Sequence, residues 1–185
     1  HSLFDTDSLR HALAGRFEGP GGFGACRLFR SFINDVYQLE GRDGRLYYLR
    51  VSQAGWRSLA QVASEAALIE AVAARGGRVA RPVPLSDGGF AFGLEAPEAL
   101  RPALLLEEAP GADLTFDGAD GPSNAEAYGR AAAGLHLAMD GLPAFPDRPG
   151  WMQDQVLDAP VTLLAEAMSP EQRRRLDPVV ERLRA

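Results

Sequence analysis

The stretch GRLYYLRVSQAGWRS, residues 44–58, places a cation where a strand should carry its most buried side chains. Residues 45–52 form an alternating apolar run, which predicts a strand. The Asp-Gly pair that precedes this run is a strong hairpin signal. Arg50 closes the run. A charge in such a place needs a partner, because a buried and unpaired charge is strongly destabilising.

The residues that follow predict a helix that carries a carboxylate toward the same sheet. Ser58 and Gln61 have the spacing of a capping box, and Gly76-Gly77 predicts the end of the helix. Glu65 lies on the edge of the apolar stripe and could pair with Arg50 across the sheet–helix interface. Two interpretations remain open: a structural ion pair, or a pair that holds a cation ready for phosphate oxygens. The stripe is Leu59, Val62, Ala66, Ile69 and Val72.

Five further strands are predicted around this unit. Two precede it, at 25–32 and 36–40, with a turn around Asn34 and Asp35. Three follow the helix: RPVPLS at 81–86, FAFGLE at 90–95 and ALLLEE at 103–108. The order β-β-β-α-β-β-β predicts a mostly antiparallel sheet with one helix packed on it, in an α+β protein.

The second half of the chain is predicted to be helical. Ser123 and Glu126 have capping-box spacing, and that helix should end near Gly141. Residues 151–168 predict one helix, or two that are broken near a proline. Ser169-Pro170 should open the last helix, with proline at its first position. Its predicted stripe is Leu176, Val179, Val180 and Leu183.

Composition narrows the function classes. The 185 residues carry a net charge of −6, which argues against nucleic acid as the main partner. All nineteen basic residues are arginine, so any cationic site must use arginine. A single cysteine, Cys26, predicts neither an internal disulfide nor a cysteine metal cluster. No apolar run reaches the ~18 residues of a membrane span and no signal peptide is evident, so we expect a cytoplasmic protein. His1 and Ser2 are read as a purification-tag remnant.

Three more segments are each weakly indicative of function, and their order along the chain is more specific than any one of them. SFIND at 31–35 is a turn that could close over a ligand, and LLLEEAPG at 104–111 is an apolar strand that ends in a break. RAAAGLHLAMD is a small-residue helix with His136 on a face expected to be packed. In this order, with NDVYQLEGRDGRLYYLRVSQAGWRS and VASEAALIEAVAARGGRVARPVP, they resemble the aminoglycoside phosphotransferase/choline kinase-type enzymes, the small-molecule branch of the protein-kinase-like fold. The resemblance runs from about residue 25 to 160 and is strongest over 33–111.

The resemblance implies a kinase-like N-lobe with its hinge at 1–111 and the start of a helical C-lobe at 112–185. Arg50 would stand where the family's lysine contacts the α- and β-phosphates of ATP, and Glu65 would orient it. A turn without glycines would cover the phosphates; its residues are Phe32, Ile33, Asn34 and Asp35.

The same resemblance implies an adenine pocket at the end of the last strand. Leu106 would border the adenine. The backbone carbonyl of Glu107 and the backbone amide of Ala109 would hydrogen-bond to the adenine edge, so their side chains could vary.

The catalytic elements of the family are not recognisable in these residues. The family needs His-x-Asp with an Asn further on, and a downstream Asp that binds Mg²⁺. His136 is followed by Leu-Ala-Met-Asp, which does not match. Catalytic and metal residues are therefore expected beyond Ala185, and the 185-residue chain alone should be inactive.

The function expected for the full-length protein is ATP- and Mg²⁺-dependent phosphoryl transfer to a hydroxyl of a small polar acceptor. The residues do not choose among an aminoglycoside, an amino alcohol, homoserine and a sugar. Two alternatives remain: a non-catalytic nucleotide-binding or interaction module, and an α+β protein whose resemblance is accidental. The uncovered stripe of the last helix also predicts self-association of the fragment.

Overall fold

The structure is a computed structural model, and it describes residues 2–109, 111, 114–145, 147 and 159–184. The chain forms two units, residues 1–148 and 149–185. The elements in chain order are α1 (Thr6–Leu13), β1 (Phe23–Ser31), β2 (Asn34–Gly41), β3 (Leu46–Ser52), α2 (Leu59–Ala74), β4 (Ala91–Glu95), β5 (Leu100–Glu107), α3 (Gly121–Met139), α4 (Ala159–Ala167) and α5 (Pro170–Arg184).

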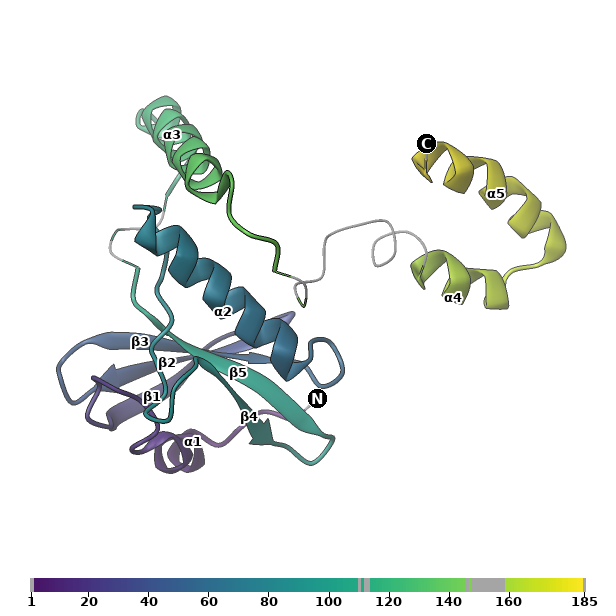
Figure 1. Cartoon of the computed structure of the whole chain (residues 1–185). Helices are drawn as coiled ribbons and strands as arrows, with labels where there is room; N and C mark the ends of the chain where they lie inside the picture. The colour runs from purple at the N-terminus through teal and green to yellow at the C-terminus, as the bar shows by residue number, and fades with distance from the viewer. Residues whose placement is uncertain (1, 110, 112–113, 146, 148–158, 185) are drawn as a thin grey trace. The chain divides into compact units, whose positions relative to one another are not determined.

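The first unit is built on a five-stranded sheet in the order β1-β2-β3-β5-β4 (Figure 1). Every pairing is antiparallel, so the predicted α+β class and sheet type are confirmed. The predicted strand at 81–86 is wrong: this segment makes only isolated bridges, such as Pro82 to Leu106. Pro82 and Pro84 have no N–H to donate, so only Val83 between them donates to β5, at 2.9 Å to the Leu105 carbonyl.

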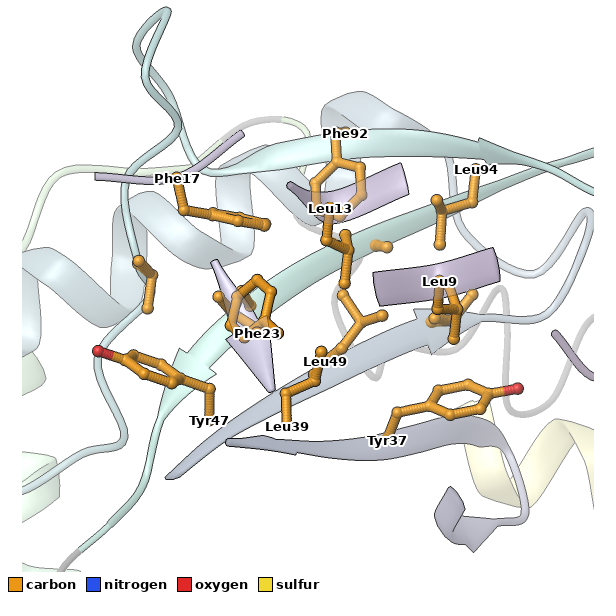
Figure 2. Close-up of a cluster of buried hydrophobic side chains, with 14 of the residues drawn as sticks. Leu9, Leu13, Phe17, Phe23, Tyr37, Leu39, Tyr47, Leu49, Phe92 and Leu94 are labelled. Carbon is orange, nitrogen blue, oxygen red and sulfur yellow. The ribbon is translucent and has the colours of Figure 1, made fainter. Parts of the chain in front are cut away.

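The main core lies on the sheet face that α1 covers. Alternation along β2 and β3 directs Leu39 and Leu49 to this face, and both are fully buried. Figure 2 shows Leu9 and Leu13 of α1 among these side chains. The short helix α1 was not predicted, although it covers an apolar face that would otherwise meet water. Each buried leucine contributes on the order of 1.5–3 kcal/mol.

Helix α2 lies on the opposite face of the sheet (Figure 1). Its predicted capping box is confirmed: the Gln61 amide donates to Ser58 Oγ at 3.2 Å, and the Ser58 amide donates to Gln61 Oε1 at 3.0 Å. The helix ends at the C-cap Arg75, and Gly76 follows with φ +80°, a conformation that favours glycine. Its buried side chains are Val62, Ala66 and Val72.

Helix α3 contacts α2 and belongs to the first unit. The predicted capping box at Ser123 and Glu126 is wrong. The helix begins at Gly121 after the N-cap Asp120, and Glu126 pairs instead with Arg130 one turn later. Pro122 fits the first turn of this helix, because its missing N–H costs nothing there.

The second unit contains α4 and α5. The predicted start of the last helix at Pro170 is confirmed, with Ser169 and Gln172 capping each other reciprocally. Of the predicted stripe on α5 only Val180 is buried, whereas Leu183 is 66% exposed. The prediction for 151–158 lies outside the described residues. None of the described helices is long and apolar enough to cross a membrane.

Candidate functional site

The predicted pairing of Arg50 with Glu65 is confirmed. Arg50 Nη1 donates to Glu65 Oε1 at 3.1 Å, and Nη2 donates to Oε2 at 2.8 Å. Arg50 comes from β3, between Val36 of β2 and Leu104 of β5, and Glu65 comes from α2. The two parallel hydrogen bonds fix the plane of the guanidinium, which makes this a geometrically specific pair.

This pair leaves part of the arginine available. The side chains of Arg50 and Glu65 are 23% and 30% exposed. A guanidinium has five N–H donors, and within the described residues Glu65 occupies only two of those of Arg50. The geometry therefore presents an oriented, partly solvated cation that can meet an anionic ligand.

A polar and aromatic surface continues from Arg50 along the same sheet face. Tyr48 lies two residues before Arg50, so both point to one side of β3. Gln38 donates to the Tyr48 hydroxyl at 2.7 Å, and Arg27 donates to Gln38 at 2.7 Å. The ring of Phe29 meets that of Tyr48 edge to face at 5.4 Å. Our sequence reasoning missed Tyr48, although its two-residue spacing from Arg50 was a visible signal.

The end of β5 lies beside this surface. Leu106 is the cross-strand partner of Tyr48 and is half-buried, as expected for the edge of a pocket. The Glu107 amide donates to the Arg81 carbonyl at 2.8 Å, and the next amide donates to Leu46 at 3.2 Å. These bonds hold the backbone on both sides, and Ala109 beyond them is exposed.

The turn between β1 and β2 is shorter than predicted. Phe32 and Ile33 form it and are 77% and 46% exposed. Asn34 and Asp35 belong to β2 instead, so the prediction of a turn around them is wrong. Alternation along β2 sends Asp35 to the α1 face, where it is fully buried against Arg101 at 2.7 Å. Its carboxylate is therefore turned away from the face that carries Arg50.

His136 differs from its predicted setting. It lies on α3 but is exposed, whereas Ala138, two residues later, is buried. No group of three or more His, Cys, Asp and Glu side chains in the described part of the chain could hold a metal ion.

One family model and two curated proteins match this sequence. The model of the phosphotransferase enzyme family matches residues 25–185. An uncharacterized protein of Deinococcus radiodurans is 33% identical over 163 residues, which are 87% of this chain and 46% of that protein. An uncharacterized protein of Synechocystis is 37% identical over 86 residues, 46% of this chain and 24% of that protein. The chain thus spans less than half the length of either relative.

Three solved structures share the fold. An amicoumacin kinase in complex with AMP-PNP and Ca²⁺ has a TM-score of 0.71 and 18% identity, covering 98% of this chain and 54% of that one. A microcompartment-associated aminopropanol kinase has a TM-score of 0.62 and 21% identity, covering 83% and 47%. A spectinomycin phosphotransferase in complex with ADP and spectinomycin has a TM-score of 0.54 and 10% identity, covering 77% and 40%.

These matches confirm the resemblance that the sequence motifs suggested. The family match includes the strands and the helix that bring Arg50 and Glu65 together. From residue 25 to residue 185, the chain belongs to the phosphotransferase enzyme family.

Proposed function

We propose that the full-length protein is an ATP-dependent phosphotransferase that transfers a phosphoryl group to a hydroxyl of a small polar acceptor. In this proposal the 185-residue chain supplies the nucleotide-binding half. The observation that carries it is the Arg50–Glu65 pair, a partly exposed cation with two of its donors held by a carboxylate on α2. Catalysis in such enzymes comes mainly from positioning and from electrostatic stabilisation of phosphoryl oxygens.

Each part of the surface has a proposed role. Arg50 contacts the α- and β-phosphates, and Glu65 orients it. Phe32 and Ile33 cover the phosphates through their backbone, and the backbone of Asn34 continues that cover. Tyr48 offers its ring to the base, because aromatic faces stack on bases with little dependence on base identity.

The end of β5 is the proposed hinge. Leu106 borders the adenine, while the carbonyl of Glu107 and the amide of Ala109 bond to its edge. The hydrogen bonds that fix Glu107 and Glu108 on both sides support this role, because a backbone template must be rigid to select one base edge.

The remaining elements are proposed to lie in a further half of the full-length protein. The catalytic base and the Mg²⁺ ligands are expected beyond Ala185, together with the acceptor pocket. The relatives are long enough to hold such a half, since the matched region is 46% of the Deinococcus protein and 54% of the amicoumacin kinase. Their substrates include an aminopropanol and the antibiotic spectinomycin by their names, which favours a small acceptor here as well. Exposed apolar side chains such as Leu137 and Leu163 are consistent with the predicted self-association of the isolated chain.

A non-catalytic nucleotide-binding module is the second candidate. It is favoured by arginine in place of the family's lysine at position 50. The two proposals agree on nucleotide binding and differ only in turnover. Phosphoryl transfer by the full-length protein to any of a panel of amino alcohols, aminoglycosides and sugars supports the enzyme, and nucleotide binding with no turnover on that panel supports the module.

Calorimetric titration of ATP and adenosine into the chain tests the nucleotide site. Arg50→Ala should weaken ATP binding by about 10- to 100-fold and leave adenosine binding unchanged, since a charge-assisted hydrogen bond is worth about 1.5–3 kcal/mol. A control is Arg175→Ala, which breaks an exposed ion pair with Glu171 at 3.0 Å on α5, a helix that contributes no residue to the proposed site. It should affect neither ligand. Equal loss of ATP and adenosine in Arg50→Ala would make the Arg50–Glu65 pair purely structural.

A further inference from the structure

Arg101 is a second internal cation, and the proposed nucleotide site does not include it. It lies on β5, and its side chain and that of Asp35 are both 0% exposed. Each guanidinium nitrogen donates to a different segment: Nη2 to Asp35 at 2.7 Å, Nε to the Ser52 carbonyl at 2.9 Å, and Nη1 to the Ser2 carbonyl at 2.7 Å. The ring of Phe4 lies against it at 5.4 Å.

Two of these contacts reach the ends of segments that border the proposed phosphate site. The other carboxylate oxygen of Asp35 accepts from Ser31 Oγ at 2.6 Å. Ser31 and Asp35 are also the cross-strand pair that closes the turn between β1 and β2. Ser52 lies two residues after Arg50 at the end of β3. Arg101 therefore links the base of the turn to the end of the strand that carries Arg50.

The turn has few other anchors. Phe32 and Ile33 at its tip are exposed, and the β1–β2 register shifts between Leu28 and Arg30, just before it. Besides the Asp35 network, Gln53 donates to the Phe32 carbonyl at 2.9 Å, and the Phe32 amide donates to the Asn34 carbonyl at 3.1 Å. A turn that binds phosphate through its backbone must be ordered beforehand, because ordering it on binding costs affinity.

We infer that Arg101 is a positioning residue for the nucleotide phosphates, acting from the face of the sheet opposite Arg50. Through Asp35 it fixes the turn that covers the phosphates, and through Ser52 it fixes the end of β3. The inference rests on the proposed function. Stability alone would not require charges here, since apolar residues of similar volume often replace a buried ion pair at no cost. The planar guanidinium adds direction, because its donors point along fixed lines.

The test compares two variants of the network with a control of similar effect on stability. Arg101→Lys keeps the charge but cannot reach three segments with one ammonium group. Ser31→Ala removes only the link between the turn and Asp35. Leu13→Ala is the control, because Leu13 is buried in the core under α1 and belongs to no part of the network. Affinities for ATP and adenosine, thermal melts and hydrogen exchange at residues 31–35 are measured for all.

Arg101→Lys should lower the ratio of ATP affinity to adenosine affinity about tenfold and Ser31→Ala about threefold, as expected for one or two lost hydrogen bonds. Both should speed hydrogen exchange at 31–35 in the nucleotide-free chain. Leu13→Ala should lower the melting temperature and leave both readouts unchanged. If Arg101→Lys does not fold, Ser31→Ala decides alone.

Lower melting temperatures with an unchanged affinity ratio would overturn the positioning role and leave the proposed function intact. Failure of the unmodified chain to bind ATP at all would overturn the proposed function, and the positioning role with it.

Discussion

Two of the arginine–carboxylate pairs on this sheet, Arg50–Glu65 and Arg101–Asp35, differ in their access to water. The pair Arg50–Glu65 is 23% and 30% exposed, whereas Arg101–Asp35 is 0% exposed on both sides. Their shortest nitrogen–oxygen distances are nearly equal, 2.8 Å and 2.7 Å. Arg50 uses two donors on one partner, while Arg101 reaches three segments of the chain.

The two pairs differ in exposure far more than in distance, and we therefore propose different roles for them. A partly solvated guanidinium keeps N–H donors for a ligand. Its removal costs the protein little stability, because water hydrates the carboxylate that is left. A fully buried guanidinium has no access to a ligand, and its removal leaves a carboxylate in an environment that penalises charge. Arg50 is thus suited to binding, and Arg101 is suited to holding the parts that bind.

Breaking the buried pair should have the largest effect. Arg101→Met leaves the Asp35 carboxylate buried without its cation, and we expect a loss of about 3–5 kcal/mol of unfolding free energy in urea titrations. Replacing both partners, as Arg101→Met with Asp35→Leu, should recover much of that loss. A double variant no more stable than the single one would show that the lost contacts to Ser52 and Ser2 dominate.

Breaking the partly exposed pair should cost far less unfolding free energy. We expect Arg50→Ala and Glu65→Ala each to lower the unfolding free energy by about 1 kcal/mol or less, because the charge left behind is still hydrated. Glu65→Ala should weaken ATP binding less than Arg50→Ala does, since it removes only the group that orients the cation. Urea titrations and ATP titrations of both variants measure this. A loss as large as that of Arg101→Met would contradict the contrast between the pairs.

Substitution by lysine at the exposed position sharpens the comparison further. Arg50→Lys should cost about 1 kcal/mol of unfolding free energy or less, because lysine keeps the charge beside Glu65 but cannot reproduce the two parallel hydrogen bonds. The resemblance implies lysine as the family's usual residue at this place, so the phosphotransferase activity that we propose for the full-length protein should largely survive. Thermal melts and turnover assays check both statements, and loss of activity with intact ATP affinity would mean that the arginine fork itself is required.

Stability at alkaline pH tests the core beneath α1 independently of the two ion pairs. Burial raises the pKa of the Cys26 thiol from 9.0 to about 11. Burial and the hydrogen bond to Asp43 raise the pKa of Tyr47 from 10.0 to about 12. Both groups keep their proton longer in the folded state, so they stabilise it below pH 9, and this contribution is lost as the pH rises from about 9 to 12.

Neither ion pair includes Cys26 or Tyr47, so the alkaline loss reports on the core beneath α1. Thermal melts from pH 8 to 11 should show declining stability in the unmodified chain, and the decline should be smaller in Tyr47→Phe. An undiminished decline in that variant would exclude Tyr47 as a source.

Predictions from sequence succeeded where a short segment carried its own signal. The helix start at Ser58 and the last helix at Pro170 follow from local capping chemistry. The pairing of Arg50 with Glu65 follows from a strand that leads into a helix, with Glu65 15 residues after Arg50. The predicted strand at 81–86 failed because its apolar residues alternate with prolines that cannot join a ladder.

Local spacing was therefore enough to predict the antiparallel sheet, its packed helix and the cation that faces it. Only the tertiary structure decided which face each residue of β2 occupies, because a shift of one residue moves a side chain to the other side of a sheet. Asp35, which was predicted in the phosphate turn, lies in β2 with its side chain on the opposite face of the sheet. There it meets Arg101, 66 residues away in the chain. No local pattern marks that contact, since it exists only because β2, β3 and β5 lie side by side in the folded sheet.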